Sequence, residues 1–191
     1  MTDLDATIQI RAAYTTSLPE ALIGSLCAVL LAASLQLFGA PAAILPAWLA
    51  AVIGFYCIRA LLAKRYRRRT RSSPRLWGGM HRLGAFVSAA LWGGIVFLIP
   101  PESGDTNLII LVFWLGVAAV WGGFVHASSI FTTLAFVTIV LAPIFWWLLQ
   151  PGQPPQWLMA GMLASATVIG LVIAQFVGRL RTRSLLFESE M

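Results

Sequence analysis

Two histidines and two cysteines are the residues of this chain whose chemistry best suits a metal ion. His81 and His126 both fall near the same predicted membrane boundary, and they approach each other if the third and fourth apolar segments pack as a hairpin. Metal or haem ligation by such a pair is one interpretation, and an interfacial histidine at a helix end is the simpler one. No carboxylate flanks either histidine in the sequence, so the metal site is a weak candidate.

The cysteines offer a second metal hypothesis of the same kind. Cys27 and Cys57 lie at similar depth on adjacent apolar segments, where two thiols suit a soft metal. Buried apolar cysteines without a metal are the alternative, and we favour it.

Aromatic residues, two of them beside paired glycines, predict a pocket in the half of the helix assembly that lies away from the basic loop at residues 64–74. Trp-Gly-Gly occurs at 77–79, 92–94 and 121–123, where indole supplies a flat apolar wall and glycine leaves room. We predict a hydrophobic small-molecule ligand there. Its candidate contacts are Trp92, Phe97, Phe113, Trp114, Trp121 and Trp146. Close helix packing through the glycines and a lipid-facing aromatic belt are the alternatives.

All these residues belong to six apolar segments that are each long enough to span a membrane. A transmembrane helix needs about 20 residues, and 59% of the 191 residues are hydrophobic while 10% are charged. The alternating pattern of a membrane β-barrel is absent. The sequence therefore predicts an all-α, polytopic membrane protein, a bundle of six transmembrane helices. The predicted spans are 18–38, 46–62, 83–99, 108–125, 130–149 and 157–177.

The placement of positive charge predicts how these spans are oriented. All 13 lysines and arginines fall before the first span, between Arg59 and Arg82, or after the sixth span, whereas the opposite turns carry Glu102 and Asp105. Basic residues are retained on the cytoplasmic side of a membrane, so we expect both termini in the cytoplasm. A net charge of +6 arranged in this way indicates contact with anionic membrane lipids and not with nucleic acid.

The predicted spans lack the groups that ion transport and catalysis usually need. No Asp, Glu, Lys or Arg lies at the middle of a predicted span, whereas ion-coupled transporters usually carry such a residue. No phosphate-binding loop, nucleophile motif or zinc-protease helix is present. We therefore predict a chain that is not itself an enzyme and has no cofactor, with a small transporter or channel as the alternative function.

The sixth span carries a stripe of small residues, which we call the small-residue stripe: Ala166, Gly170, Ala174 and Gly178. Residues four apart share a helix face, and small side chains let two helices approach closely. The stripe suits a homodimer or packing within one chain. No Gly or Pro follows Gly178, so residues 179–191 are predicted to continue the helix, and we favour the homodimer because paired helices can transmit a shift.

The arrangement resembles the MASE-type membrane sensor modules that precede diguanylate cyclase (GGDEF), EAL phosphodiesterase or histidine kinase domains in bacteria. The matching features are the six short spans, residues 82–86 leading to 91–93, the turn at 100–101, and residues 179–190 as an exit helix. The resemblance implies a sensor in the bacterial inner membrane that controls a cytoplasmic output domain, fused or separate. The chain then divides into a cytoplasmic arm (1–16), a sensor domain (17–178) and the start of a signalling helix (179–191).

Overall fold

The computed structural model describes Ile10, Tyr14 and residues 16–41, 43–67, 73–99, 106–150 and 154–190. In these residues all regular secondary structure is α-helical. Each helix contains a stretch long and apolar enough to cross a membrane, which confirms the all-α class and the number of candidate spans. The helices are α2 (Ser17–Leu37), α3 (Ile44–Arg67), α4 (Pro74–Leu98), α5 (Thr106–Val125), α6 (Ile130–Leu148) and α7 (Pro154–Glu190).

Three helices extend well beyond the spans that hydropathy predicts. α3 continues through Lys64, Arg65 and Arg67 in its last turn, and α4 begins at Pro74, in the first-turn position where proline is tolerated. α7 runs on to Glu190. Hydropathy finds only the apolar part of a helix, whereas lysine and arginine are good helix formers that carry it into water. The predicted turns at 100–105 and 151–155 fall largely outside the described residues, as does most of the predicted arm.

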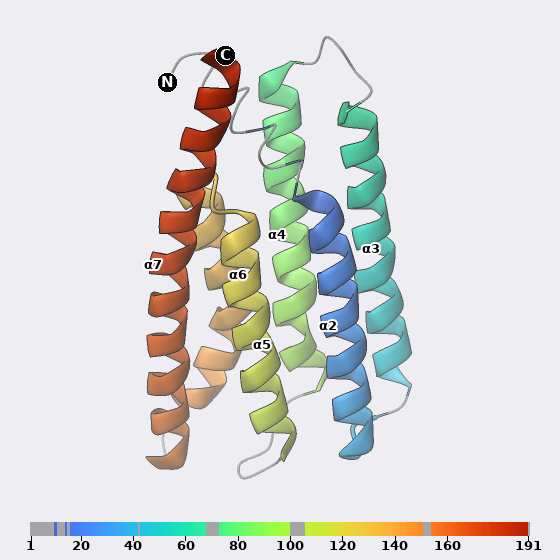
Figure 1. Cartoon of the computed structure of the whole chain (residues 1–191). Coiled ribbons are helices and arrows are strands. Elements are labelled where there is room, and N and C mark those ends of the chain that lie inside the picture. The colour runs from blue at the N-terminus through green and yellow to red at the C-terminus, as the bar shows by residue number, and fades with distance from the viewer. Residues whose placement is uncertain are drawn as a thin grey trace.

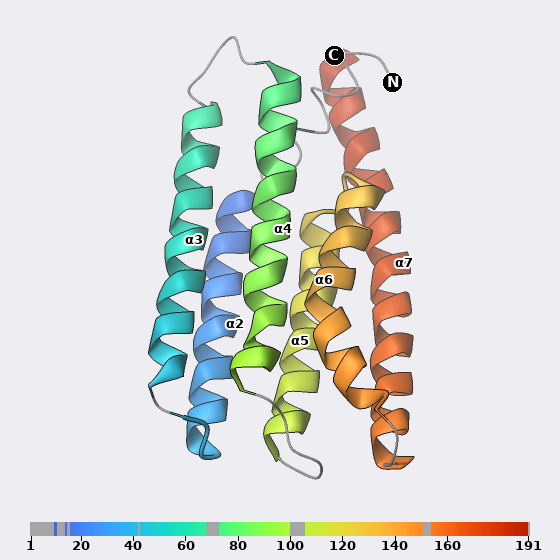
Figure 2. The same cartoon turned by 180° about the vertical axis from the view of Figure 1, so that it is seen from behind.

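The six helices lie side by side in both views (Figures 1 and 2). α2 packs on α3 and α5, and α6 packs on both α4 and α5, while α7 packs mainly on α5. The sequence neighbours α4 and α5 touch only slightly, so a close hairpin of the third and fourth spans is not what brings the two histidines together. The two histidines on these segments are brought together because α4 and α5 both pack on α6.

Glycines of the repeated Trp-Gly-Gly tripeptide allow close helix contacts at two points. A Cβ at Gly93 would lie 2.6 Å from the carbonyl oxygen of Ile139, and one at Gly122 would lie 2.0 Å from the Phe136 ring. α6 therefore approaches α4 and α5 at these two points because no side chain intervenes. Close packing, the alternative use of these glycines, is what the structure shows at both positions.

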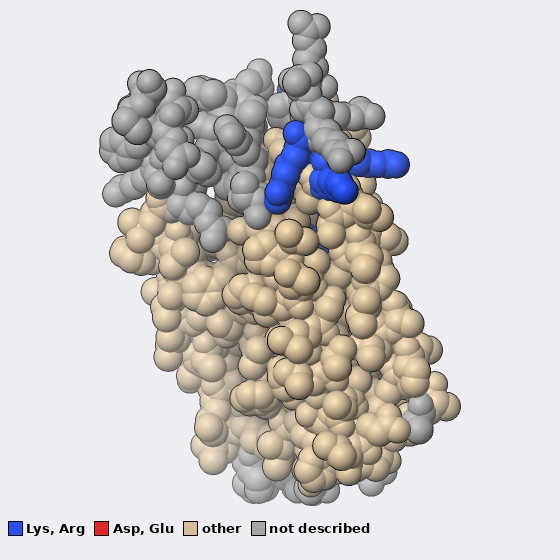
Figure 3. All heavy atoms as spheres, turned by 45° about the vertical axis from the view of Figure 1, so that its right-hand side comes forward, with Lys and Arg blue, Asp and Glu red and all other residues tan. Residues whose placement is uncertain are grey.

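The start of α2, the end of α3, the start of α4 and the end of α7 all point to the same end of the molecule (Figure 1). On the face drawn in Figure 3, lysine and arginine side chains gather toward this end, beside a wide area of other residues. Near this end a small apolar cluster forms from Tyr14, Ala63 and Trp77. The main apolar core fills the remaining length of the helices. We call the two ends of the molecule the basic end and the opposite end.

Candidate functional site: a buried polar cluster

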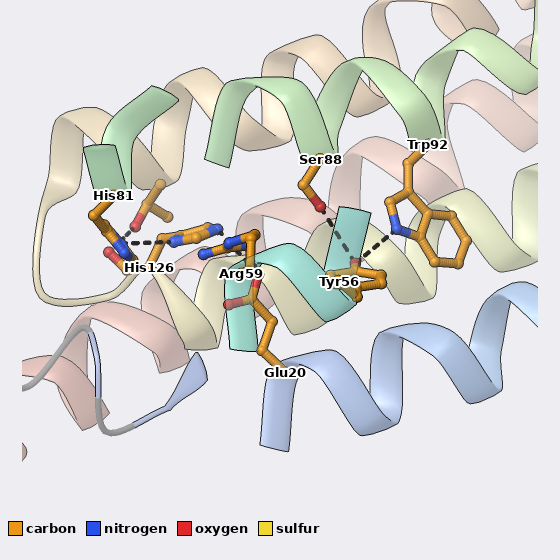
Figure 4. Close-up of polar contacts among 8 residues, drawn as sticks. Glu20, Tyr56, Arg59, His81, Ser88, Trp92 and His126 are labelled. Atoms are coloured by element: carbon orange, nitrogen blue, oxygen red, sulfur yellow. Dashed lines mark hydrogen bonds and ion pairs between the residues drawn. The ribbon is translucent and has the colours of Figure 1, made fainter. Parts of the chain in front are cut away.

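Four ionisable side chains from four segments meet inside the protein near its basic end (Figure 4). We call them the polar cluster: Glu20 of α2, Arg59 of α3, His81 of α4, and His126 directly after α5. Their exposed fractions are 3%, 5%, 8% and 0%. Charged groups at such depth are costly unless they are paired, so the cluster is a candidate functional site.

Glu20 and Arg59 form a buried ion pair, in which Arg59 Nη1 donates to Glu20 Oε1. The sequence analysis counted Arg59 with the basic residues at one end of the spans, and the structure buries its side chain inside the helix assembly. The periodicity of α3 explains the difference, because Val52, Tyr56 and Ala63 share the buried face on which Arg59 lies. Both charges therefore lie within helices of membrane-spanning length, so the interior is not free of charge.

The two histidines touch each other, as the first interpretation of the sequence required. His126 Nδ1 lies 3.3 Å from His81 Nε2, and His126 Nε2 lies 3.9 Å from Glu20 Oε1. If His81 Nε2 carries the proton of the shared contact, His126 points an N–H toward the carboxylate, and this tautomer suits both neighbours. A carboxylate does flank the pair in space, although none does in the sequence.

His126 is held as a neutral imidazole. Burial lowers the pKa of His126 well below 6.5, and the nearby charge of Arg59 and the His81 ring lower it further. The hydroxyl of Thr133 donates to the His126 carbonyl oxygen at 2.8 Å, which fixes the turn after α5. His126 thus lies between α4, α5 and α6.

The cluster is poorly suited to a metal ion. Among the described residues, no group of three or more His, Cys, Asp or Glu side chains is arranged to hold one. The Arg59 guanidinium also places positive charge where the cation would bind. Cys27 is partly buried and Cys57 is exposed, so the two thiols occupy different surroundings.

A network of neutral side chains continues the cluster along α3 and α4. Trp92 Nε1 donates to the Tyr56 hydroxyl oxygen at 2.9 Å, and Ser88 Oγ lies 3.3 Å from the same oxygen. Tyr56 is three residues before Arg59, so both project from one face of α3. The Tyr56 ring occupies the space above Gly24 of α2, where a Cβ would lie 2.4 Å from it. Figure 4 shows the resulting row of polar groups from His81 to Trp92.

Several buried polar atoms of this region have no hydrogen-bond partner among the described residues. They are Glu20 Oε2, Arg59 Nη2, His126 Nε2 and Trp121 Nε1. Leaving such an atom unpaired costs about 1–3 kcal/mol, so an unsatisfied group in a native protein calls for an explanation. A cavity of about 10 Å³ touches Glu20, Tyr56, Trp92 and Trp121, which is roughly the room that one water molecule needs.

The structure does not bring the six predicted aromatic contacts together. Trp92 and Trp121 line the small cavity, and Trp114 packs against the main core. Phe97, Phe113 and Trp146 point outward, with exposed fractions of 70%, 60% and 74%. Their orientation agrees with the lipid-facing belt, which was the alternative interpretation of these side chains.

The small-residue stripe faces mostly into the chain. A Cβ at Gly170 would lie 2.8 Å from Val120, and Ala174 is fully buried. A Cβ at Gly178 would lie 2.5 Å from the carbonyl oxygen of Ala127. Only Ala166 of the stripe is exposed, so packing within one chain accounts for the other three residues.

Comparisons of the chain with protein-family models, with curated proteins and with solved structures find no match. The function is therefore inferred from the geometry of the polar cluster and its contacts.

Proposed function

We propose that this chain is a membrane sensor module of the MASE-like kind, with both termini in the cytoplasm of a bacterium. The polar cluster perceives the signal, and α7 relays it to a cytoplasmic output domain such as a diguanylate cyclase, phosphodiesterase or histidine kinase. The observation that carries the proposal is the contact between the turn that holds His126 and the backbone of α7 at Gly178.

The contact gives the cluster a direct mechanical path to α7. Ala127 follows His126 in the chain, and its carbonyl oxygen lies only 2.5 Å from the position that a Cβ at Gly178 would take. Interfaces packed this closely tend to move between discrete arrangements and do not deform continuously. A change in the contacts of His126 with Glu20 or His81 would therefore displace α7 at Gly178.

The form of α7 suits a relay. It is one helix of 37 residues, which is about 55 Å at a rise of 1.5 Å per residue. Its apolar part covers Gln156–Leu180, and the helix continues ten residues farther to Glu190. A displacement at Gly178 acts where the helix leaves its apolar part, so it would be passed to whatever the helix joins.

A homodimer is part of this proposal, because output domains of this kind work in pairs according to the resemblance. With three stripe residues occupied inside the chain, the dimer contact would use Ala166 and the exposed apolar side chains beside it. Ile169, Ile173 and Phe176 are exposed to 61%, 47% and 64%.

The relay is tested by fusing a histidine kinase output domain after Glu190 and measuring autophosphorylation in native membranes. Glu20→Gln changes the cluster and is expected to shift the kinase output, whereas the same substitution combined with Gly178→Leu is expected to leave output unresponsive. Gly161→Leu is the matched control, because Gly161 lies on the same helix with nothing within 4 Å of its Cβ position. An equal response in the Gly178 and Gly161 variants contradicts the relay.

A small transporter is the second candidate, and the Glu20–Arg59 pair favours it, since ionisable groups inside a membrane often mark ion or proton paths. The purified chain in liposomes with an internal pH dye separates the two functions. The sensor proposal predicts no proton flux above that of empty liposomes under a pH gradient or a membrane potential. A flux that Glu20→Gln abolishes would favour the transporter.

The orientation in this proposal follows from the basic residues. Reporter fusions after Asp105 and after Met191 are expected to place the first outside the cytoplasm and the second inside it. A cytoplasmic signal from the Asp105 fusion would reverse or refute the orientation.

A further inference from the structure

A second cavity opens on the side of the molecule between α3 and α4, next to the polar cluster. We call it the lateral groove. Its volume is about 150 Å³, and it is lined mostly by apolar side chains, together with Tyr14, Ser17, Arg59 and His81. Ile58 and Leu83 are exposed to 55% and 63% at its rim, whereas Arg59 and His81 are exposed to only 5% and 8%. The groove thus leads from an apolar surface to two buried polar residues.

The rim faces the membrane if the two helices span it. Ile58 of α3 and Leu83 and Val87 of α4 lie inside the segments that are long and apolar enough to cross. A molecule that enters between them comes from the bilayer, so its body must be apolar.

Gly84 is the point at which the groove reaches Arg59. A Cβ at Gly84 would lie 3.2 Å from Arg59 Nε and 3.6 Å from its Cδ. Because glycine has no side chain, the guanidinium is not covered from the α4 side. A larger residue at this position would separate the groove from the polar cluster.

We propose that the lateral groove binds a lipophilic molecule whose head is a neutral carbonyl group, with Arg59 as the donor to that carbonyl. The inference rests on the proposed sensor function and deepens it by naming the class of ligand. The apolar body lies against Phe55, Ile58 and Leu83, and the head is directed past Gly84.

The hydrogen-bonding capacity of Arg59 requires an acceptor in the head. A guanidinium has five N–H donors, and the structure gives Arg59 one bonding partner among the described residues, Glu20. Its Nη2 is buried without a partner there. A carbonyl oxygen accepts a hydrogen bond from Arg59. It carries no N–H or O–H of its own, which is an advantage because a guanidinium cannot accept a hydrogen bond.

The charge of the cluster requires that head to be neutral. Glu20 already balances Arg59, and His126 is held uncharged by its surroundings. A carboxylate head would therefore add an uncompensated negative charge in a region of low dielectric constant, which is strongly unfavourable. Ketones, quinones and acyl esters meet the requirement, and ionised fatty acids do not.

Tyr14 closes the groove at the basic end. Its hydroxyl donates to the Trp77 carbonyl oxygen at 3.2 Å, and its ring stacks on Tyr66 with centroids 4.5 Å apart. Burial raises the pKa of Tyr14 to about 12, although the charge of Arg59 offsets part of this effect. Tyr14 therefore stays uncharged, and its ring gives the groove an apolar end wall.

The test uses the full chain in nanodiscs with a photoreactive methyl ester of a long-chain fatty acid, its diazirine placed near the head. Crosslinked peptides are mapped by mass spectrometry. We expect saturable labelling of the α3 and α4 segments that line the groove, at least fivefold above labelling by the corresponding free acid at pH 8. Equal or stronger labelling by the acid would contradict the requirement for a neutral head. If excess unlabelled ester does not reduce the labelling, the groove is not a specific binding site.

Two glycines on α4 provide the matched variants. Gly84→Leu fills the groove and is expected to abolish groove labelling, whereas Gly79→Leu, at a position with nothing within 4 Å, is expected to retain it. The thermal unfolding midpoint shows whether each variant folds. If Gly84→Leu does not fold, competition by unlabelled ester in the wild-type chain decides whether the groove is the binding site. Labelling that survives in a folded Gly84→Leu chain contradicts the proposal.

Competitors identify the source of the carbonyl. Displacement by decyl benzoquinone or by an uncharged diacylglycerol supports the proposed class and tells which source fits better, and failure of both to displace the probe overturns it. No output domain is present in this assay, so its failure would leave the relay through Gly178 standing, to be judged by the kinase fusion alone.

Discussion

The basic end and the opposite end of the molecule place their distinctive side chains in opposite directions. At the basic end, Glu20, Arg59 and His126 turn inward and are almost completely buried. At the opposite end, Phe113 and Trp146 turn outward and are exposed to 60% and 74%. His126 and the exposed aromatic residues were candidates in the sequence, whereas Glu20 and Arg59 were not. Only the group at the basic end forms a site, because its three members come from three segments and meet one another and His81 of α4.

The difference shows which kind of residue marks function in a membrane protein. An aromatic side chain on the surface of a membrane-spanning helix is stable against lipid and needs no partner. A buried charge persists only where the surrounding structure supplies a partner, as Arg59 does for Glu20. The polar cluster therefore depends on the arrangement of the whole helix assembly, whereas the exposed aromatics depend on their own helix alone.

Breaking the ion pair is expected to have the largest effect. Glu20→Ala leaves Arg59 buried and unpaired, at a cost of about 3–5 kcal/mol, and Arg59→Met leaves Glu20 in the same condition. Thermal unfolding in detergent micelles measures the loss. The double variant removes both charges and is expected to recover more than half of it. If the Glu20→Ala chain is as stable as wild type, the polar cluster depends on its partners no more than the exposed aromatic residues do.

Acid is expected to weaken the basic end through His126. Because the pKa of His126 is depressed in the folded protein, below about pH 6.5 the unfolded chain takes up a proton that the folded chain does not. Stability is then lost as the pH falls through this value, by up to about 1.4 kcal/mol per pH unit, and this contribution is absent above it. Unfolding midpoints between pH 5 and 8 measure the slope. His126→Gln should reduce it, and an unchanged slope would assign it to other groups.

The smallest expected effects compare two tryptophans. Trp92→Phe removes the donor to the buried Tyr56 hydroxyl and is expected to cost about 1 kcal/mol. Trp146→Phe alters an exposed ring and is expected to stay within about 0.5 kcal/mol of wild type. Chemical denaturation of both variants in the same detergent measures the difference. Equal losses would mean that the opposite end holds a structured site after all.

The sequence predicted the parts of this structure that depend on local composition. Hydropathy located all six helices, and the lack of a helix breaker after Gly178 predicted that α7 continues. The ion pair was missed because Glu20 and Arg59 are 39 residues apart and neither interrupts its apolar segment. A local signal did exist, since Glu20 shares a helix face with Gly24, Ala28 and Leu35, and that face is buried.

The candidate site was predictable only where helix positions already constrained it. His81 and His126 were expected near one boundary, and they do meet. The aromatic residues shared a depth in the predicted membrane but not a direction, because direction depends on which face of each helix its neighbours cover. α7 illustrates this dependence, since Gly170 and Gly178 of the small-residue stripe turn toward Val120 and Ala127 of the same chain.

The most direct test of the account is whether a change in the polar cluster moves α7. Spin labels at Leu76 of α4 and Leu180 of α7, both exposed, report their separation by pulsed electron resonance in nanodiscs, with Cys27 and Cys57 replaced by serine. Glu20→Gln is expected to shift the most populated distance by about 1–2 Å, the scale of helix shifts in signalling, and Gly178→Leu is expected to alter or abolish that response. A Glu20→Gln chain that folds as wild type does and leaves the distance distribution unchanged would contradict the relay.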